Sequence, residues 1–355
     1  MMRIGLVGCG HIGTVHAYAL QQLHDAQLVD AALTATFDTD ASRAARVARH
    51  HGGEPAASLE ALLDAVDVVW VCTWTAGHLE VVDAAATRGL PIFCEKPLAR
   101  TLAECEQVAS ALRRVPHQVG LVLRWSPVFA RAAEIVHDGR FGAVLGATLR
   151  DDQYFPIQGL YGSTWRKDAA LAGGGTLLEH SIHDVDVLRW LLGDPDDVTA
   201  RVASRFGHEG IDDAVAVTFA YPGEVVATLT SIWHQVTTRE SSRRLEVFCE
   251  DALLWTDDDY LGPLHVHTAS GEETVAAAVP GWADQLSVPE VFAKAVAHYA
   301  EPSKAFLDGL RADATTTGHP DVDDALAAHR LVDAAYRSAA AGGVPQRVTP
   351  AVRGG

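Results

Sequence analysis

The first 124 residues alternate between short apolar runs and longer amphipathic segments. The apolar runs, which predict strands, cover residues 3–7, 28–37, 68–72, 91–94 and 118–123. The amphipathic segments, which predict helices, end near residue 23 and then cover residues 41–50, 58–65, 78–88 and 101–112. Apolar strands that alternate with helices are typical of a parallel sheet covered on both faces. This part of the chain is therefore predicted to be an α/β domain with a parallel sheet.

After about residue 143, apolar and polar residues alternate instead. Six such runs predict strands at residues 144–150, 198–206, 214–221, 225–233, 245–249 and 264–268. This alternation is typical of a large, mostly antiparallel sheet with one covered face. Helices are expected from Gly173 to Trp190 and over residues 288–309 and 322–341. We expect residues 1–124 and 125–355 to form two α/β domains, with the last helix packing back on the first.

Length and composition agree with two globular domains. A single core seldom exceeds about 250 to 300 residues, and this chain has 355, of which 48% are hydrophobic and 21% charged. The net charge of −18 argues against a nucleic-acid partner. No apolar run approaches the roughly 18 residues of a membrane helix, and no secretory signal opens the chain, so we expect a cytoplasmic protein. The five cysteines are scattered, which suits reduced thiols.

A glycine-rich turn follows the first predicted strand. It reads Gly8-Cys9-Gly10-His11-Ile12-Gly13 and opens a helix. Glycine at positions 8 and 10 permits a tight turn and the close approach of a pyrophosphate, and Gly13 permits close packing of helix and strand. Asp38 ends the second strand, where an acid accepts ribose hydroxyls and repels a 2′-phosphate. The motif predicts a dinucleotide cofactor and favours NAD over NADP, although Asp38 also suits a helix cap.

Two further turns follow strands of the same domain. Since the carboxyl ends of parallel strands face the ligand crevice, Lys96 of the Glu95-Lys96-Pro97 turn should project toward the cofactor. The turn that follows the strand at residues 68–72 also carries cofactor-binding candidates. Trp74 in this turn either stacks near the nicotinamide or fills space. The cofactor-binding candidates of both turns are Thr73, Trp74, His78, Glu95 and Lys96.

The segment from Gly173 to Trp190 concentrates ionisable groups on an apolar helix. Glu179, His183 and Asp186 are spaced to share one helical face, where a carboxylate can orient an imidazole. The alternative is a helix N-terminus enriched in acids by its dipole. Glu179, His180 and His183 also resemble metal ligands, but no cysteine or further paired histidine supports a metal site, and none is predicted.

The loop of residues 153–167 is rich in aromatic and polar groups, which suits either a pocket for a small polar ligand or an ordinary connection. The substrate-binding candidates are Lys96, Arg124, Tyr154, Trp165, Arg166, His180 and His183.

With these residues in view, the chain resembles the Gfo/Idh/MocA family of nicotinamide-dependent sugar and cyclitol oxidoreductases over almost its full length. The resemblance rests on the glycine turn, Asp38, the Cys94-to-Ala99 stretch, Leu123-Arg124-Trp125, the segment from Gly173 to Gly193 and the last helix ending in Tyr336-Arg337-Ser338. It implies a Rossmann domain joined to an α/β domain whose open sheet mediates homodimers or homotetramers. It also implies that Lys96 is catalytic.

Four positions depart from the family's usual residues. The family's usual aspartate corresponds to Glu179 and its histidine to His183, so this chain differs by one methylene. His180 and Ser181 also replace small or apolar residues, and Trp74 stands where proline is common. These changes leave the substrate in doubt more than the reaction.

The combined hypothesis is hydride transfer between NAD and a CH–OH group of a small carbohydrate-like substrate. His183 would exchange the hydroxyl proton, Lys96 would bond the same oxygen, and Glu179 would orient the pair. The alternatives are a reductase of a non-sugar substrate and a non-catalytic, NAD-binding sensor.

Overall fold

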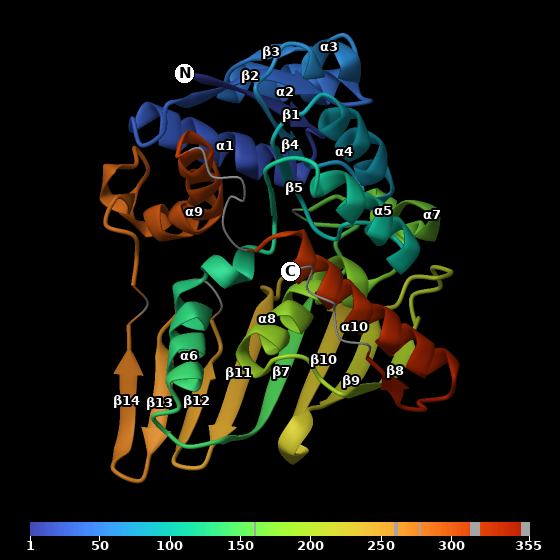
Figure 1. Cartoon of the computed structure of the whole chain (residues 1–355), viewed down its shortest axis with the longest axis vertical. Coiled ribbons are helices and arrows are strands. Elements are labelled where there is room, and N and C mark those ends of the chain that lie inside the picture. Colours follow the sequence, from blue (N-terminus) through green and yellow to red (C-terminus); the bar gives the residue numbers. More distant parts are fainter. Residues whose placement is uncertain (160, 259–261, 277, 313–319, 349–355) are drawn as a thin grey trace. The chain divides into compact units, whose positions relative to one another are not determined.

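The computed structural model describes residues 1–159, 161–258, 262–276, 278–312 and 320–348. The chain divides into two compact units (Figure 1). Unit 1 comprises residues 1–122 and 279–326, and unit 2 comprises residues 123–278 and 327–355. The expected division at residue 124 thus differs from the observed one, because residues 279–326 return to the first unit. Each unit is described by itself.

A six-stranded parallel sheet forms the centre of unit 1. Its strand order is β3-β2-β1-β4-β5-β6, and every described pairing is parallel. The strands are β1 (Met2–Val7), β2 (Ala31–Phe37), β3 (Glu54–Pro55), β4 (Val68–Val71), β5 (Ile92–Cys94) and β6 (His117–Val119). The helices are α1 (His11–Asp25), α2 (Ala41–His51), α3 (Leu59–Leu63), α4 (His78–Thr87), α5 (Leu102–Leu112) and α9 (Glu290–Arg311). The parallel α/β domain is confirmed.

Two hydrophobic clusters account for this arrangement. One lies among β4, β5, α4 and α5 and includes Val69, Val82 and Val108. The other contains Trp70 stacked on Phe93 at 5.4 Å between ring centroids, with α1 and the α9 residue Phe306 packed beside them. Strands buried on both faces explain why the runs are apolar throughout. Contacts of α9 with α1 and the sheet explain why residues 279–326 belong to unit 1.

A nine-stranded sheet forms unit 2, in the order β14-β13-β12-β11-β7-β10-β9-β8-β15. The pairing of β7 with β10 is parallel, and the other described pairings are antiparallel. The strands are β7 (Val144–Tyr154), β8 (Asp197–Ala203), β9 (Ala214–Ala220), β10 (Val226–His234), β11 (Ser242–Cys249), β12 (Ala252–Thr256), β13 (Leu264–Thr268), β14 (Gly271–Val275) and β15 (Gln346–Arg347). The mostly antiparallel sheet is confirmed, while β12, β14 and β15 were not predicted.

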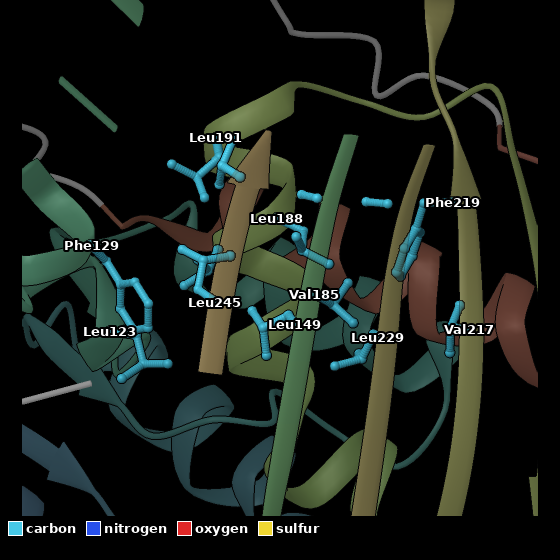
Figure 2. Packing of buried hydrophobic residues seen from close by; sticks show 14 of the residues in the cluster. Leu123, Phe129, Leu149, Val185, Leu188, Leu191, Val217, Phe219, Leu229 and Leu245 are labelled. Carbon is cyan, nitrogen blue, oxygen red and sulfur yellow. The ribbon is translucent and has the colours of Figure 1, made fainter. Parts of the chain in front are cut away.

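Helices α6 (Pro127–Asp138), α8 (Ile182–Leu192) and α10 (Val322–Ala340) cover one face of this sheet (Figure 1). Leu149, Leu229 and Leu245 point from three strands toward Val185 and Leu188 of α8 (Figure 2). A half-covered sheet of this kind needs apolar residues at alternate positions, which is the pattern that predicted the strands.

Helix α6 was not predicted, although its boundaries follow standard rules. Ser126 caps its start by accepting a bond from Phe129 N at 3.5 Å, Pro127 occupies the first turn, and Gly139 ends it in the left-handed region at φ 65°. The strand expected at residues 118–123 is also shorter than predicted, because a 3₁₀ turn, η2 (Val122–Trp125), replaces its end.

Candidate active site

In unit 1, the glycine turn between β1 and α1 has the shape that its sequence predicts. Gly8 has φ +93°, and a Cβ there would lie 2.5 Å from the backbone of Cys72. A Cβ on Gly13 would lie 2.0 Å from Gly8 O, so glycine is required at both positions. A Cβ on Gly10 would meet no atom of the described chain within 4 Å. Open space at the start of a 15-residue helix without a side-chain cap fits a pyrophosphate.

Asp38 lies where β2 ends and reaches back to the glycine turn. Its Oδ2 accepts the N–H of Cys9 at 2.7 Å, and its Oδ1 accepts the N–H of Asp40 at 2.8 Å. These bonds position a carboxylate whose remaining lone pairs suit ribose hydroxyls. Arg43 lies 3.5 Å from Asp40, with which it forms an ion pair. The helix cap that Asp38 was also suited to form is made by Asp40.

His78 stabilises the turn after β4 through a hydrogen bond to its backbone. His78 Nε2 bonds Thr73 O at 3.2 Å, and Thr73 Oγ1 donates to Trp74 O at 3.0 Å. Burial lowers the pKa of His78, which favours a neutral ring. His78 is buried and supports the turn, and its contact with a cofactor stays a prediction. Trp74 and Thr73 are partly exposed, and their contact with the cofactor stays a prediction.

Lys96 follows β5 at the carboxyl edge of the same sheet and is partly exposed. The side chain before it points inward, because Glu95 is 4% exposed and bonds His16 Nε2 at 2.7 Å. Glu95 Oε2 also accepts the Lys96 N–H at 3.1 Å. Glu95 therefore supports Lys96, and its contact with the cofactor stays a prediction.

In unit 2, the segment after the three glycines is not one continuous α-helix. A single π-helical turn, η4 (Thr176–His180), comes first, and α8 starts at Ile182 after Ser181. Asp212 anchors the turn by accepting N–H groups of Gly175 at 2.7 Å and Leu177 at 2.9 Å, and the hydroxyl of Tyr336 at 2.7 Å. A Cβ on Gly175 would lie 1.8 Å from Asp212 O, so this close approach requires glycine.

Glu179 and Asp186, two of the three side chains expected to share one face, lie in different helical elements. Glu179 lies in η4 and accepts a bond from Arg166 Nε at 3.2 Å, while Arg166 stacks 4.4 Å from the Trp165 ring centroid. Asp186 lies in α8 and holds Arg124 through two bonds of 2.7 and 2.8 Å. Whether Glu179, His183 and Asp186 share one face stays a prediction.

Arg166 and Arg124 were both expected to grip substrate. The structure pairs each with a buried carboxylate, so neither guanidinium is independent of the chain. Tyr154 instead contacts the ring of Tyr161 at 5.4 Å between centroids, and Trp165 is partly exposed. Residue 160 of this loop lies outside the described residues. A pocket formed by these aromatic groups stays a prediction.

His180 belongs to a buried polar cluster beneath α8. Its Nε2 lies 2.8 Å from Asp151 Oδ2 and 3.3 Å from Arg243 Nη2. Arg243 also donates to Asp184 Oδ1 at 2.7 Å and Asp151 Oδ2 at 3.2 Å. Ser181 Oγ bonds the same Asp151 oxygen at 3.0 Å. His180 is thus held by the sheet, and whether it also reaches substrate stays a prediction.

Two carboxyl groups of this cluster, Asp151 and Asp184, both bond the Arg243 guanidinium. Burial, and then the neighbouring Asp151 carboxyl, raise the pKa of Asp184 to about 7, against the opposing effect of Arg243. The pair therefore holds a proton over much of the range in which an ordinary aspartate has lost it.

Two protein-family models match this chain. Residues 2–121 match the model for an oxidoreductase family with an NAD-binding Rossmann fold, and residues 129–254 match the model for the Gfo/Idh/MocA C-terminal domain. The chain belongs to the Gfo/Idh/MocA family of oxidoreductases. The NAD-binding Rossmann domain and the α/β fold of unit 2 expected from the sequence are both confirmed.

Relatives within the Gfo/Idh/MocA family align over much of the chain. Inositol 2-dehydrogenase of Rhizobium meliloti (strain 1021) is 29% identical over 351 residues, which cover 96% of this chain and 97% of that protein. A 1,5-anhydro-D-fructose reductase of Ensifer adhaerens is 30% identical over 240 residues, covering 64% and 68%. The crystal structure of a putative myo-inositol dehydrogenase from Sinorhizobium meliloti 1021 has a TM-score of 0.77 at 26% identity and covers 98% and 100%.

In the part of this Gfo/Idh/MocA chain that the structure describes, no group of three or more His, Cys, Asp or Glu residues is arranged to hold a metal ion. None of the described helices is long and apolar enough to cross a membrane. The five cysteines are free thiols, as expected, and all are buried.

The sequence did not identify several residues of this family member that hydrogen-bond, directly or through one another, to the candidate site residues. They are His16, Asp151, Asp184, Asp212, Ser231, Arg243 and Tyr336. A usable signal existed for two of them. Asp151 and Arg243 occupy inward positions of their strands, in step with the buried Leu149 and Leu245. A charged residue at an inward position needs a buried partner and therefore marks a polar cluster.

Proposed function

We propose that this protein is an NAD-dependent dehydrogenase that acts on a CH–OH group of a sugar, a cyclitol or a sugar derivative. Membership of an NAD-binding oxidoreductase family supports the reaction class. Relatives named inositol 2-dehydrogenase and 1,5-anhydro-D-fructose reductase support a polyhydroxylated substrate. Trp165 supports it as well, because a partly exposed indole suits the apolar face of a sugar ring.

One observation carries the proposal. Lys96 leaves β5 at the carboxyl edge of the parallel sheet, the edge that also bears the glycine turn and Asp38. Ligands of open α/β sheets bind at this edge. The buried carboxylate of Glu95 behind Lys96 is an arrangement that suits an ammonium held for chemistry.

NAD, His183, Lys96 and Glu179 are assigned different roles in the reaction. Bound NAD supplies the carbon that accepts or returns the hydride. The N-terminus of α1 and Asp38 suit its pyrophosphate and ribose. We assign His183 to exchange of the hydroxyl proton and Lys96 to bonding the same oxygen, where its charge stabilises the developing alkoxide. Glu179 is assigned to orienting this pair.

The test follows NADH formation at 340 nm with a panel of sugars, cyclitols and anhydrosugars. The wild type should turn over at least one of them. Lys96→Ala and His183→Ala should each lower kcat by about 10² to 10⁴, because each removes a positioned acid or base. NAD binding, measured by intrinsic fluorescence, should stay close to that of the wild type. The double variant should be little worse than either single variant, since groups that act as a unit are not additive.

A matched comparison addresses Glu179. Glu179→Asp restores the residue usual at this position and should affect kcat less than Lys96→Ala, while changing the order of preferred substrates. Near-normal turnover by folded Lys96→Ala and His183→Ala would sink the assignment. The proton carrier would then be sought at His180.

We also propose that unit 2 forms a homodimer or homotetramer through the open face of its sheet. Val215, Val217, Phe219 and Leu229 are buried, because they share the parity of the covered face. The exposed row instead joins Phe248, Gly146 and Val226 across β11, β7 and β10, with Leu145 beside it. An apolar row of this kind supports association. A cytoplasmic location stays a prediction.

A further inference from the structure

The buried carboxylate of Glu95 lies directly behind Lys96 in unit 1. An ionised carboxylate that is 4% exposed is costly unless it is bonded and its charge is compensated. Glu95 accepts two bonds, from His16 Nε2 at 2.7 Å and from the Lys96 N–H at 3.1 Å. Burial opposes its ionised form, yet the bond and charge of His16 and the charge of Lys96 hold the pKa of Glu95 below its usual value. Glu95 is therefore an anion inside the unit.

His16 holds this carboxylate from the opposite side. It lies in α1, one turn after the glycine motif, and is fully buried with its ring edge toward Phe93 at 5.1 Å between centroids. Its Nδ1 is buried and has no hydrogen-bond partner. A carboxylate only accepts hydrogen bonds, so the Nε2–H of His16 donates this bond to Glu95.

The backbone prevents the carboxylate from turning away. A Cβ at Gly120, just after β6, would lie 2.7 Å from Glu95 Oε1 and 2.9 Å from its carboxyl carbon. The carboxylate thus packs flat against a glycine on one side and accepts bonds from His16 and the Lys96 N–H on others. A group fixed in this manner can orient its neighbour without reorganising during a reaction.

The other titratable groups that interact with Glu95 are neutral. Burial, together with the Glu95 charge, raises the pKa of the Cys72 and Cys94 thiols, which therefore stay protonated. Burial lowers the pKa of His78, which therefore loses its proton. Of the described groups that interact electrostatically with Glu95, His16 and Lys96 are the ones whose charge lowers the pKa of Glu95.

We propose that Glu95 is the positioning residue of Lys96: its buried negative charge keeps the Lys96 ammonium protonated and aimed, and His16 holds Glu95 in place. This inference rests on the proposed function, which assigns Lys96 to the substrate oxygen. It links the first helix of the chain to the reacting group through two side chains. The consequence is an alkaline limit on activity that is set inside unit 1.

The first experiment measures kcat/KM against pH for the wild type and Glu95→Gln. Glutamine keeps the shape and removes the charge. Without a nearby anion, Lys96 should lose its proton at lower pH, by about one pH unit for an opposite charge in close range. The alkaline limb should move accordingly, while the acidic limb, assigned to His183, stays in place. Glu106→Gln, which removes an exposed carboxylate of α5 in the same unit, should shift neither limb.

The second experiment observes Lys96 without turnover. Acylation of Lys96 by a water-soluble reagent, quantified by peptide mass spectrometry over a pH series, reports its unprotonated fraction. At a fixed pH below the midpoint, Glu95→Gln should raise the acylation rate of Lys96 about tenfold, which is one pH unit. His16→Leu should act in the same direction, because an unbonded buried Glu95 takes up a proton. His16→Gln, which can still donate a bond, should restore most of the wild-type profile.

Either of two results would overturn the inference. One is an unchanged alkaline limb together with an unchanged Lys96 acylation profile in folded Glu95→Gln. The other is equal behaviour of His16→Leu and His16→Gln. Failure of the proposed function is distinguishable, because Lys96→Ala would then keep its activity whatever the Glu95 variants do. Circular dichroism and NAD affinity establish that each variant is folded.

Discussion

Arg243→Met should destabilise unit 2 far more than the loss of an ordinary surface charge. Arg243 is 4% exposed and bridges Asp184 at 2.7 Å and Asp151 at 3.2 Å, both of which are fully buried. Methionine fills a similar volume without a charge or a donor. The variant therefore leaves two buried carboxyl groups with no guanidinium between them.

The magnitude follows from burial. Breaking a buried ion pair by removing one partner costs about 3 to 5 kcal/mol, against about 0 to 1 kcal/mol for an exposed pair. Arg337→Met is a matched control, because Arg337 pairs with Asp333 at 2.7 Å on the exposed side of α10. We expect the cost of Arg243→Met to exceed that of Arg337→Met several-fold.

The cost should also rise with pH. The folded-state pKa of Asp184, about 7, lies above the unfolded value near 3.8, so its stabilising proton is fully held below the unfolded value and lost as pH rises through 7. Without Arg243 the folded-state pKa rises further, and the variant keeps its proton at pH 8 where the wild type has lost it. Between pH 7 and pH 8 the folded variant thus holds about one proton more than the folded wild type. This adds about 1.4 kcal/mol to the stability cost of Arg243→Met at pH 8, compared with its cost at pH 5.

Denaturant titration read by hydrogen exchange of peptides from β7 and α8 is the appropriate assay, because a chain of two units need not unfold in one step. The series is run at pH 5 and pH 8. Adding Asp184→Asn to Arg243→Met removes one of the two carboxyl groups and should recover part of the loss at pH 8. A cost below 1 kcal/mol that is equal at both pH values would refute the view that Arg243 compensates buried charge.

Three further outcomes are expected. Asp38→Ala should weaken NAD binding by about 1 to 3 kcal/mol, a range typical of losing a hydrogen-bonded charged group. The variant should also show a smaller preference for NAD over NADP. Tighter binding of NADP than of NAD by the wild type would contradict this expectation. Tyr336→Phe removes a 2.7 Å bond to the buried Asp212 and should cost about 1 to 3 kcal/mol in the same exchange assay, whereas no change would show that Asp212 anchors η4 without it. Light scattering should give a dimeric or tetrameric mass, which Phe248→Glu should reduce and Glu246→Gln, on the same strand, should not; a monomeric wild type at micromolar concentration would exclude association through this face.

Much of the fold was predictable because its signals are local. The apolar runs of unit 1 and the alternating runs of unit 2 located most strands, since each period reflects which faces of a strand are buried. The assignment of faces was less secure. Val215, Val217 and Leu229 lie against the helices, whereas Val226 of β10 is exposed. Residue alternation shows that two faces differ but does not say which residues meet a helix.

The candidate site likewise contains residues that the sequence predicted and residues that it did not. By itself, the sequence determined the positions where the backbone demands glycine, such as Gly8 and Gly13, and the polar residues that directly follow strands, such as Asp38 and Lys96, because these requirements are encoded within a few neighbouring residues. Only the tertiary structure decided which distant groups support them. The bonds of Glu95 with His16 and of Arg243 with Asp184 span 79 and 59 residues, and they depend on helix docking and strand register. The break at Ser181 likewise arises from contacts with Asp151 and Ser231 on the sheet, since a π turn is stabilised by packing and not by the spacing of its own residues.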